Sequence, residues 1–249
     1  MIIFLTGIVV GILLLSEQPD STNRLSPEPA KGGNYTEALT GSIQRLNPLF
    51  DSNNPVDQAV DRLLFSRLLT FDEHGYPVGD LAQSWGNSQD GTVYNIALNP
   101  KAEWHDGKPV TTDDVIFTVK LMQNGGDVVP QDLQDFWNNI ELVRLDDHNM
   151  QFKLPEAYAP FLDYLSFGIL PSHIFDGKTI GDIEQMDTNL APVGSGPYQF
   201  DQLIVENGQI TGVSLKAFSD YYGDEPFIQQ FFRHDIMFAG QFCCIEVIT

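Results

Sequence analysis

Basic residues are scarce in this chain of 249 residues. It holds 13 Lys and Arg against 34 Asp and Glu, which gives a formal net charge of −21. A surface that binds nucleic acid needs clustered Lys and Arg, so we expect no nucleic-acid partner. The acidity is typical of a soluble chain, or of one that works among other anions.

Cysteine is almost absent, and the two cysteines present, Cys243 and Cys244, are adjacent. Neighbouring Cα atoms lie about 3.8 Å apart, whereas a disulfide requires about 5.5 Å. The five histidines are spread along the chain without the short spacing of metal ligands. We therefore predict no disulfide framework, no metal site and no cofactor.

Motifs for nucleophilic catalysis or phosphate binding are also lacking. Ser195 lies between two glycines, but an esterase elbow would need glycine where Val193 and Pro197 stand. A dinucleotide loop would need a third glycine where Gln199 stands. Two interpretations of Gly194–Gly196 stay open: a backbone turn that needs small residues, or a loop that lines a ligand. We predict no catalytic residue and no enzymatic activity.

Long apolar runs are limited to one, residues 1–15 at the N-terminus. Fifteen residues are short for a membrane span, which needs about 20, and match the core of a signal peptide. No basic residue precedes the run and no clear cleavage site follows it. We predict a signal sequence or an uncleaved membrane anchor, followed by a polar, Pro-rich tether over residues 16–31. This layout predicts a location outside the cytoplasm, in the periplasm or on the outer face of the membrane.

Residues 80–123 carry the densest structural pattern in the chain. Gln89-Asp90-Gly91 predicts a turn, and the alternation in Val93–Leu98 predicts a half-buried strand. His105–Pro109 predicts a second turn. A helix then begins at Thr111, with apolar residues at helical spacing and acidic residues in its first turn.

The rest of the chain alternates between strands and helices without regular βαβ repetition. The patterns predict a strand over 34–40, a helix over 56–69, a short helix near 133–137, a short helix or turn over 161–165, and hairpins pairing 140–145 with 149–154 and 199–205 with 211–217. Asn207-Gly208 closes the last hairpin, because both positions tolerate positive φ. This mixture indicates an α/β (mixed α+β) fold.

This ordered series resembles the family-5 extracellular solute-binding proteins, the peptide- and nickel-type receptors of ABC importers. The resemblance covers residues 31–232, and further pieces in the same order are Leu46-Asn47-Pro48-Leu49, Tyr158-Ala159-Pro160-Phe161, Ile169–His173 and Gly194–Tyr198. It implies a periplasmic-binding-protein-like type II fold. Residues 32–232 would form its first lobe, with a mixed sheet and an inserted subdomain at about 55–172. A strand near 226–232 would then cross to a second lobe. Residues 233–249 match nothing expected of the family, so we expect a truncated or frameshifted end and a chain that holds the N-terminal lobe only.

The resemblance also implies a function. It predicts capture of a small solute, an oligopeptide in the commonest case, and delivery to ABC permease subunits, by a protein that is monomeric when full length. The loops expected to contact the ligand contain Ser42, Gln44, Tyr164, Phe167 and Ser195, and His105 is expected to pin a strand-to-helix junction by hydrogen bonding. An envelope-tethered hydrolase and a surface adhesion domain are the alternatives. We also expect residues 227–232 to expose an apolar, unpaired strand edge that favours aggregation.

Overall fold

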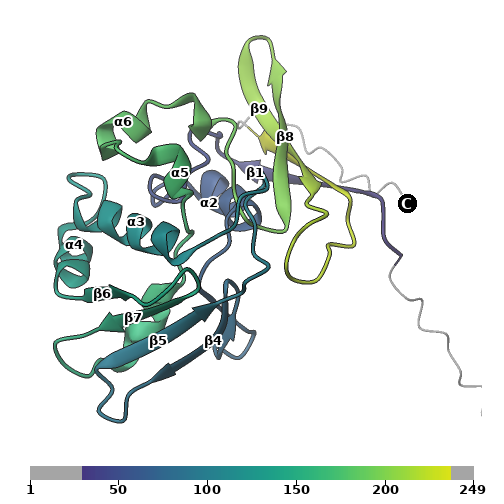
Figure 1. Cartoon of the computed structure of the whole chain (residues 1–249). Helices are drawn as coiled ribbons and strands as arrows, with labels where there is room; N and C mark the ends of the chain where they lie inside the picture. The colour runs from purple at the N-terminus through teal and green to yellow at the C-terminus, as the bar shows by residue number, and fades with distance from the viewer. Residues whose placement is uncertain (1–29, 237–249) are drawn as a thin grey trace, which may run out of the picture. The chain divides into compact units, whose positions relative to one another are not determined.

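The computed structural model of the chain describes residues 30–236 (Figure 1), and within this range residues 31–236 belong to one compact unit. The predicted signal or anchor segment, nearly all of the predicted tether and residues 237–249 lie outside the described residues. Within residues 30–236, no helix is both long enough and apolar enough to cross a membrane.

The first sheet has four strands in the order β1-β10-β9-β8: β1 is Asn34–Thr40, β10 is Gln230–Ile236, β9 is Gln209–Ala217 and β8 is Tyr198–Glu206. Strands β1 and β10 are parallel, and the other pairs are antiparallel. Asn207 (φ 51°) and Gly208 (φ 79°) form the turn between β8 and β9. The predicted first strand and the predicted hairpin are both confirmed.

The expectation of an unpaired strand edge at residues 227–232 is wrong. Strand β10 lies inside its sheet, with β1 on one side and β9 on the other, so its backbone groups are paired on both sides. Phe231 is only 9% exposed. The exposed apolar surface in this segment is at Phe227, which is 52% exposed.

The second sheet has the order β4-β5-β7-β6: β4 is Ala82–Asn87, β5 is Val93–Leu98, β7 is Asn149–Lys153 and β6 is Glu141–Arg144. All of its pairs are antiparallel. The strand over Val93–Leu98 and the β6–β7 hairpin were predicted. Strand β4 was not, because its residues are mostly exposed and lack alternation. A small third sheet pairs β2 (Leu69–Phe71) with β3 (Pro77–Gly79).

The principal helices are α2 (Pro55–Leu64), α3 (Thr112–Gln123) and α4 (Gln131–Asn138). Shorter ones are the 3-10 helices η1 (Ala159–Leu165) and η2 (Asp187–Asn189), with α5 (Ser172–Phe175) and α6 (Ile180–Glu184). Helix α3 contacts α4, α5 and β6 (Figure 1).

Helix α2 is shorter than the predicted 56–69. The apolar spacing continues through Leu68, but Phe65 already has extended dihedral angles (φ −117°, ψ 122°). The backbone N–H of Gly196 donates a hydrogen bond (2.8 Å) to the carbonyl of Leu64. A contact from a segment far along the chain therefore replaces the next helical turn, which local periodicity cannot reveal.

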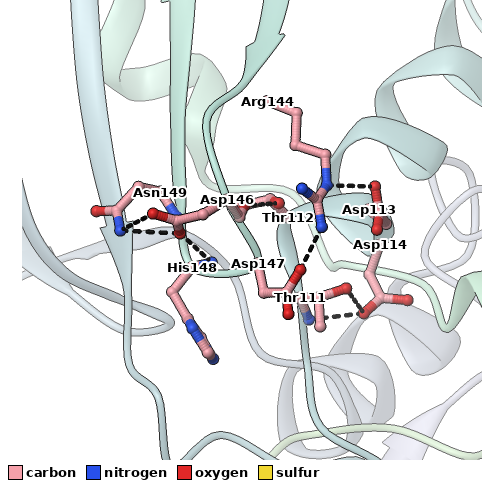
Figure 2. A network of polar contacts seen from close by, with 9 residues as sticks. All are labelled: Thr111, Thr112, Asp113, Asp114, Arg144, Asp146, Asp147, His148 and Asn149. Atoms are coloured by element: carbon pink, nitrogen blue, oxygen red, sulfur yellow. Dashed lines mark hydrogen bonds and ion pairs between the residues drawn. The ribbon is translucent and has the colours of Figure 1, made fainter.

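A polar network fixes the start of α3 against the β6–β7 turn, as Figure 2 shows. Thr111 and Asp114 form a reciprocal capping box. The hydroxyl of Thr112 donates to the carbonyl of Asp146 (2.7 Å). Arg144 bridges Asp147 and Asp113, the latter at 3.0 Å. The acidic first turn of α3 is thus explained by capping and by this ion pair, and no ligand is needed to account for it.

The hydrophobic core is continuous between the strands and helices. Its largest fully buried side chains include Trp104, Trp137, Phe152 and Phe161. The rings of Phe136, Trp137, Phe152 and Phe161 make tilted or edge-on contacts that join α4, β7 and η1. This packing positions the loops described next.

Candidate ligand-binding site

The loop over residues 41–45 follows directly from the carboxyl end of β1, which pairs in parallel with β10. Ligands of open α/β sheets bind beyond the carboxyl ends of parallel strands. Ser42 and Gln44 are exposed, whereas Ile43 between them is buried. In the described part of the chain, neither the Ser42 hydroxyl nor the side-chain amide of Gln44 has a hydrogen-bonding partner within the protein.

Two residues at the start of α2, the N-cap Asn54 and Asp57 in the first turn, hold this loop in place. The carboxylate of Asp57 accepts hydrogen bonds from the backbone N–H groups of Gln44 and Arg45, both at 3.0 Å. The side-chain amide of Asn54 donates to the carbonyl of Ser42 (2.9 Å) and to Asp57 (2.8 Å). Asn54 also caps α2 by accepting from the Val56 backbone N–H (3.1 Å). The buried carboxylate of Asp57 and the N-cap residue Asn54 therefore determine the conformation of the exposed loop.

Gly41 makes this arrangement possible. Its φ of +141° disfavours any side chain, and a Cβ there would lie 2.7 Å from the Cγ2 atom of Val56. The loop can lie against the first turn of α2 only with glycine at this position.

Tyr164 and Phe167 lie in a different place, on η1 and just after it. The ring of Tyr164 stacks on Phe136 of α4 with 4.1 Å between the ring centroids. Phe167 packs edge-on against Trp137 at 5.5 Å. Both residues are half-buried and help to pack η1 against α4, and Phe167 also lines a cavity beside α2.

Ser195 is completely buried, so its side chain reaches no solvent. Its carbonyl accepts a hydrogen bond from the Ser66 hydroxyl (2.9 Å). A Cβ on Gly194 would lie 1.8 Å from the Leu64 carbonyl oxygen, and one on Gly196 would lie 2.4 Å from that of Leu63. The small residues therefore let this loop approach the last turn of α2.

His105 clamps the same loop. Its Nδ1 accepts a hydrogen bond from the Gly194 backbone N–H (3.1 Å), and its Nε2–H donates to the Gly196 carbonyl (3.0 Å). This pattern requires the neutral ring. Burial lowers the pKa of His105 from 6.5 to about 4, although the contact with Gly196 opposes the shift. The predicted pinning role is confirmed, but the partner is the Gly194–Gly196 loop, which is distant in sequence.

The five predicted site residues thus fall in three places. Ser42 and Gln44 lie together at the N-terminal end of α2. The Ser195 loop packs at the opposite end of that helix, which is about 15 Å long. Tyr164 and Phe167 belong to the η1 region. A role for any of these five side chains in ligand binding stays a prediction.

Two features were missed at the level of sequence. One is the cavity beside α2, lined by Asp61 among others. The other is a buried network in which the Tyr222 hydroxyl contacts Asp80 and Ser66. The i, i+3, i+7 spacing of Gln58, Asp61 and Phe65 on α2 is a signal that could have drawn attention to the cavity. Among residues 30–236, no group of three or more His, Cys, Asp or Glu side chains could hold a metal ion.

Comparison with known proteins identifies relatives over most of the chain. The family described as "Bacterial extracellular solute-binding proteins, family 5 Middle" matches residues 76–231. The oligopeptide-binding protein AppA of Bacillus subtilis is 27% identical over 84% of this chain. The dipeptide-binding protein of Escherichia coli is 31% identical over 75% of this chain. In each case the aligned region is 38% of the relative, so this chain spans well under half the length of these relatives.

Solved structures give the same result. AppA of Bacillus subtilis in complex with a nonapeptide superimposes with a TM-score of 0.74 at 25% identity, over 84% of this chain and 41% of AppA. NikZ of Campylobacter jejuni in complex with Ni(L-His) gives 0.69 at 29% identity, over 84% of this chain and 40% of NikZ. The described residues therefore form part of a mixed α/β, type II periplasmic-binding-protein fold, as predicted.

Proposed function

Because this chain belongs to the bacterial extracellular solute-binding proteins of family 5, we propose that it takes part in capturing short peptides outside the cytoplasm for an ABC-type importer. Proteins of this family bind solutes and are not enzymes, so the hydrolase alternative falls away. The relatives are named for oligopeptides and dipeptides, and NikZ was solved with a nickel chelate. Peptide is the solute class that most of these names share.

The observation that carries the proposal is the exposed loop over residues 41–45. Its backbone is held by Asp57 and Asn54 rather than by a ligand, so the loop is preorganised before a solute arrives. Two polar side chains, Ser42 and Gln44, are directed outward from it. An extended peptide could form hydrogen bonds with the backbone of this loop and with the side chains of Ser42 and Gln44.

The affinity of this chain alone is expected to be low, because it spans 38% of the length of AppA and of the dipeptide-binding protein. A micromolar complex corresponds to about 8 kcal/mol, and half of that free energy corresponds to millimolar binding. We therefore propose that the described residues supply part of a larger site and bind free peptide no more tightly than about 1 mM.

We also propose that the protein delivers the solute to ABC permease subunits. The full-length protein would be a monomer, anchored to the membrane by residues 1–15. The family places its members outside the cytoplasm. Attachment to the membrane would keep a weakly binding receptor near its permease and raise the effective concentration.

The test is a nuclear magnetic resonance titration of the ¹⁵N-labelled full chain with N-acetyl-trialanine amide, a peptide without charged ends. We expect amide shifts concentrated at residues 41–45, with a dissociation constant of about 1 mM or weaker. The variant Gln44→Ala removes one exposed side chain of the loop and should weaken these shifts. Gln89→Ala, in an exposed turn between β4 and β5, is the matched control.

Two outcomes would contradict the proposal. Absence of any shift at residues 41–45 at about 20 mM peptide would show that the loop does not contact peptide. Equal effects of Gln44→Ala and Gln89→Ala would show that the binding is not local to the loop. If the chain instead adhered to whole cells without binding peptide, the surface adhesion domain would be the better interpretation.

A further inference from the structure

A cavity of about 360 Å³ lies along one face of α2. Four of its polar wall residues are ionisable: Asp51 before the helix, Asp61 and Arg62 within it, and Arg67 after it. Gln58 and Phe167 also line it. Its size falls at the lower end of the range for small-molecule sites, about 300–1,000 Å³.

The walls of the cavity are fixed by tight backbone packing. Gly168 forms a β-bridge with Arg67, and a Cβ on Gly168 would lie 2.8 Å from the Cγ of Pro48. The backbone N–H of Ile169 donates to the carbonyl of Ser66 (3.0 Å). The cavity is therefore formed by the packing of α2 and the residues after it against the segment after η1.

Asp61 has an unusual environment for a buried carboxylate. It is 3% exposed, and neither of its carboxylate oxygens accepts a hydrogen bond of normal geometry in residues 30–236, although the backbone N–H of Asn47 interacts with the carboxylate and lowers its pKa. The other two buried aspartates differ. Asp57, one turn earlier on α2, accepts three hydrogen bonds, and Asp114 accepts from Thr111, Trp104 and Ser172. A buried carboxylate without donors is costly unless it is protonated or meets a cation.

The charged groups around Asp61 do not neutralise one another by direct contact. Within the described residues, neither Arg62 nor Arg67 forms an ion pair with Asp51 or Asp61. Burial raises the pKa of Asp51 to about 6 and raises that of Asp61 well above its ordinary value; nearby carboxylates add to both shifts, and the charge of Arg67 opposes both. Burial lowers the pKa of Arg67. Acidic and basic groups thus line one cavity and influence one another, but within the described residues they form no direct ion pair.

We propose that this cavity binds a small zwitterion of the amino-acid class, with its ammonium group on Asp61 and its carboxylate on the Arg67 side. An ammonium group would supply the donors that Asp61 lacks, and a guanidinium group suits a carboxylate. The absence of a three-ligand group among residues 30–236 favours an organic cation over a metal ion. The inference rests on the proposed function for the class of solute, and it adds a second point of contact.

The experiment is a titration of the ¹⁵N-labelled full chain with L-alanine. We expect saturable amide shifts in α2 and residues 166–168. Ethylammonium chloride, which carries only the cation, should bind more weakly, and sodium propionate should not bind. Asp61→Asn keeps the shape of the side chain, and it should weaken L-alanine binding about tenfold or more, because a hydrogen-bonded charge pair is lost.

Matched variants make the result specific. Asp127→Asn changes the net charge equally at an exposed position and should leave L-alanine binding unchanged. Arg67→Gln should weaken L-alanine binding while ethylammonium binding is retained. Because Asp61→Asn removes an unpaired buried carboxylate, this variant should unfold at a temperature no lower than that of the parent.

Three results would overturn the inference: no saturable shifts in this region up to about 100 mM L-alanine, unchanged binding by Asp61→Asn, or saturation of the same residues by KCl or CaCl₂ alone. The test is separable from that of the proposed function, because the blocked tripeptide carries no ammonium group. Shifts at residues 41–45 without L-alanine binding would remove only the cavity proposal, and the reverse result would remove only the peptide proposal.

Discussion

The hydrogen bonds of His105 offer the sharpest test of how the fold is held together. His105→Phe keeps a ring that can pack against Phe218, which lies 4.8 Å away between centroids. It removes the acceptor for the Gly194 N–H and the donor to the Gly196 carbonyl. Each buried group left unpaired costs about 1–3 kcal/mol. We therefore expect the free energy of unfolding to fall by about 2–6 kcal/mol.

The pH dependence follows from the lowered pKa of His105. Between pH 6.5 and about 4 the unfolded chain binds a proton at this residue and the folded chain does not. The stability that His105 contributes is therefore complete above pH 6.5 and is lost as the pH falls toward 4. The shift corresponds to at most about 3 kcal/mol.

The assay is urea unfolding of the parent and of His105→Phe at several pH values between 4 and 8. The difference between their free energies of unfolding isolates His105, because all other groups titrate in both chains. That difference should be largest at pH 7–8 and should shrink on acidification. His74→Phe, whose parent side chain is 67% exposed, is the control and should change stability by less than about 0.5 kcal/mol. A difference that grows toward pH 4, or one as small as the control's, would refute the reasoning.

Three further predictions concern packing, hydrogen bonding and charge. Gly196→Ala should destabilise the chain by about 1–3 kcal/mol in urea unfolding, because its Cβ would lie 2.4 Å from the Leu63 carbonyl oxygen; Gly86→Ala, with open space, should cost less. Tyr222→Phe should lower stability by about 1–2 kcal/mol, because it removes the hydroxyl that Asp80 and Ser66 share; an unchanged melting temperature would contradict this. Raising NaCl from about 0.05 to 1 M should raise the melting temperature, because screening relieves repulsion in a chain of net charge −21; a fall would show that attractive ion pairs dominate.

Local sequence patterns correctly predicted the elements that are determined by interactions between residues close together in the sequence. The Asn207-Gly208 turn, the alternating strand β5 and the capped start of α3 all follow from neighbouring residues, and the structure confirms them. The family resemblance, which rests on the order of such pieces, was confirmed by comparison with known proteins.

The errors occur where distant segments decide the structure. Strand β4 exists because it pairs with β5, although its own residues show little β pattern. Helix α2 ends where the backbone N–H of Gly196 binds the carbonyl of Leu64, and β10 is an interior strand because it returns beside β1. The cavity beside α2 was missed for the same reason, since its walls come from α2, from residues on either side of that helix, and from the segment after η1. Helical spacing in the sequence shows which side chains share one face of a helix, but it does not show which other segment packs against that face.

The most direct test of the central claim is photo-crosslinking of the full chain with a blocked tripeptide that carries a diazirine side chain, followed by mass spectrometric mapping. If the loop after β1 contacts peptide, the crosslinks should concentrate at residues 41–45, and excess unlabelled N-acetyl-trialanine amide should suppress them. Crosslinks scattered over the surface, or unaffected by competitor, would contradict the assignment of this loop as a peptide-binding segment.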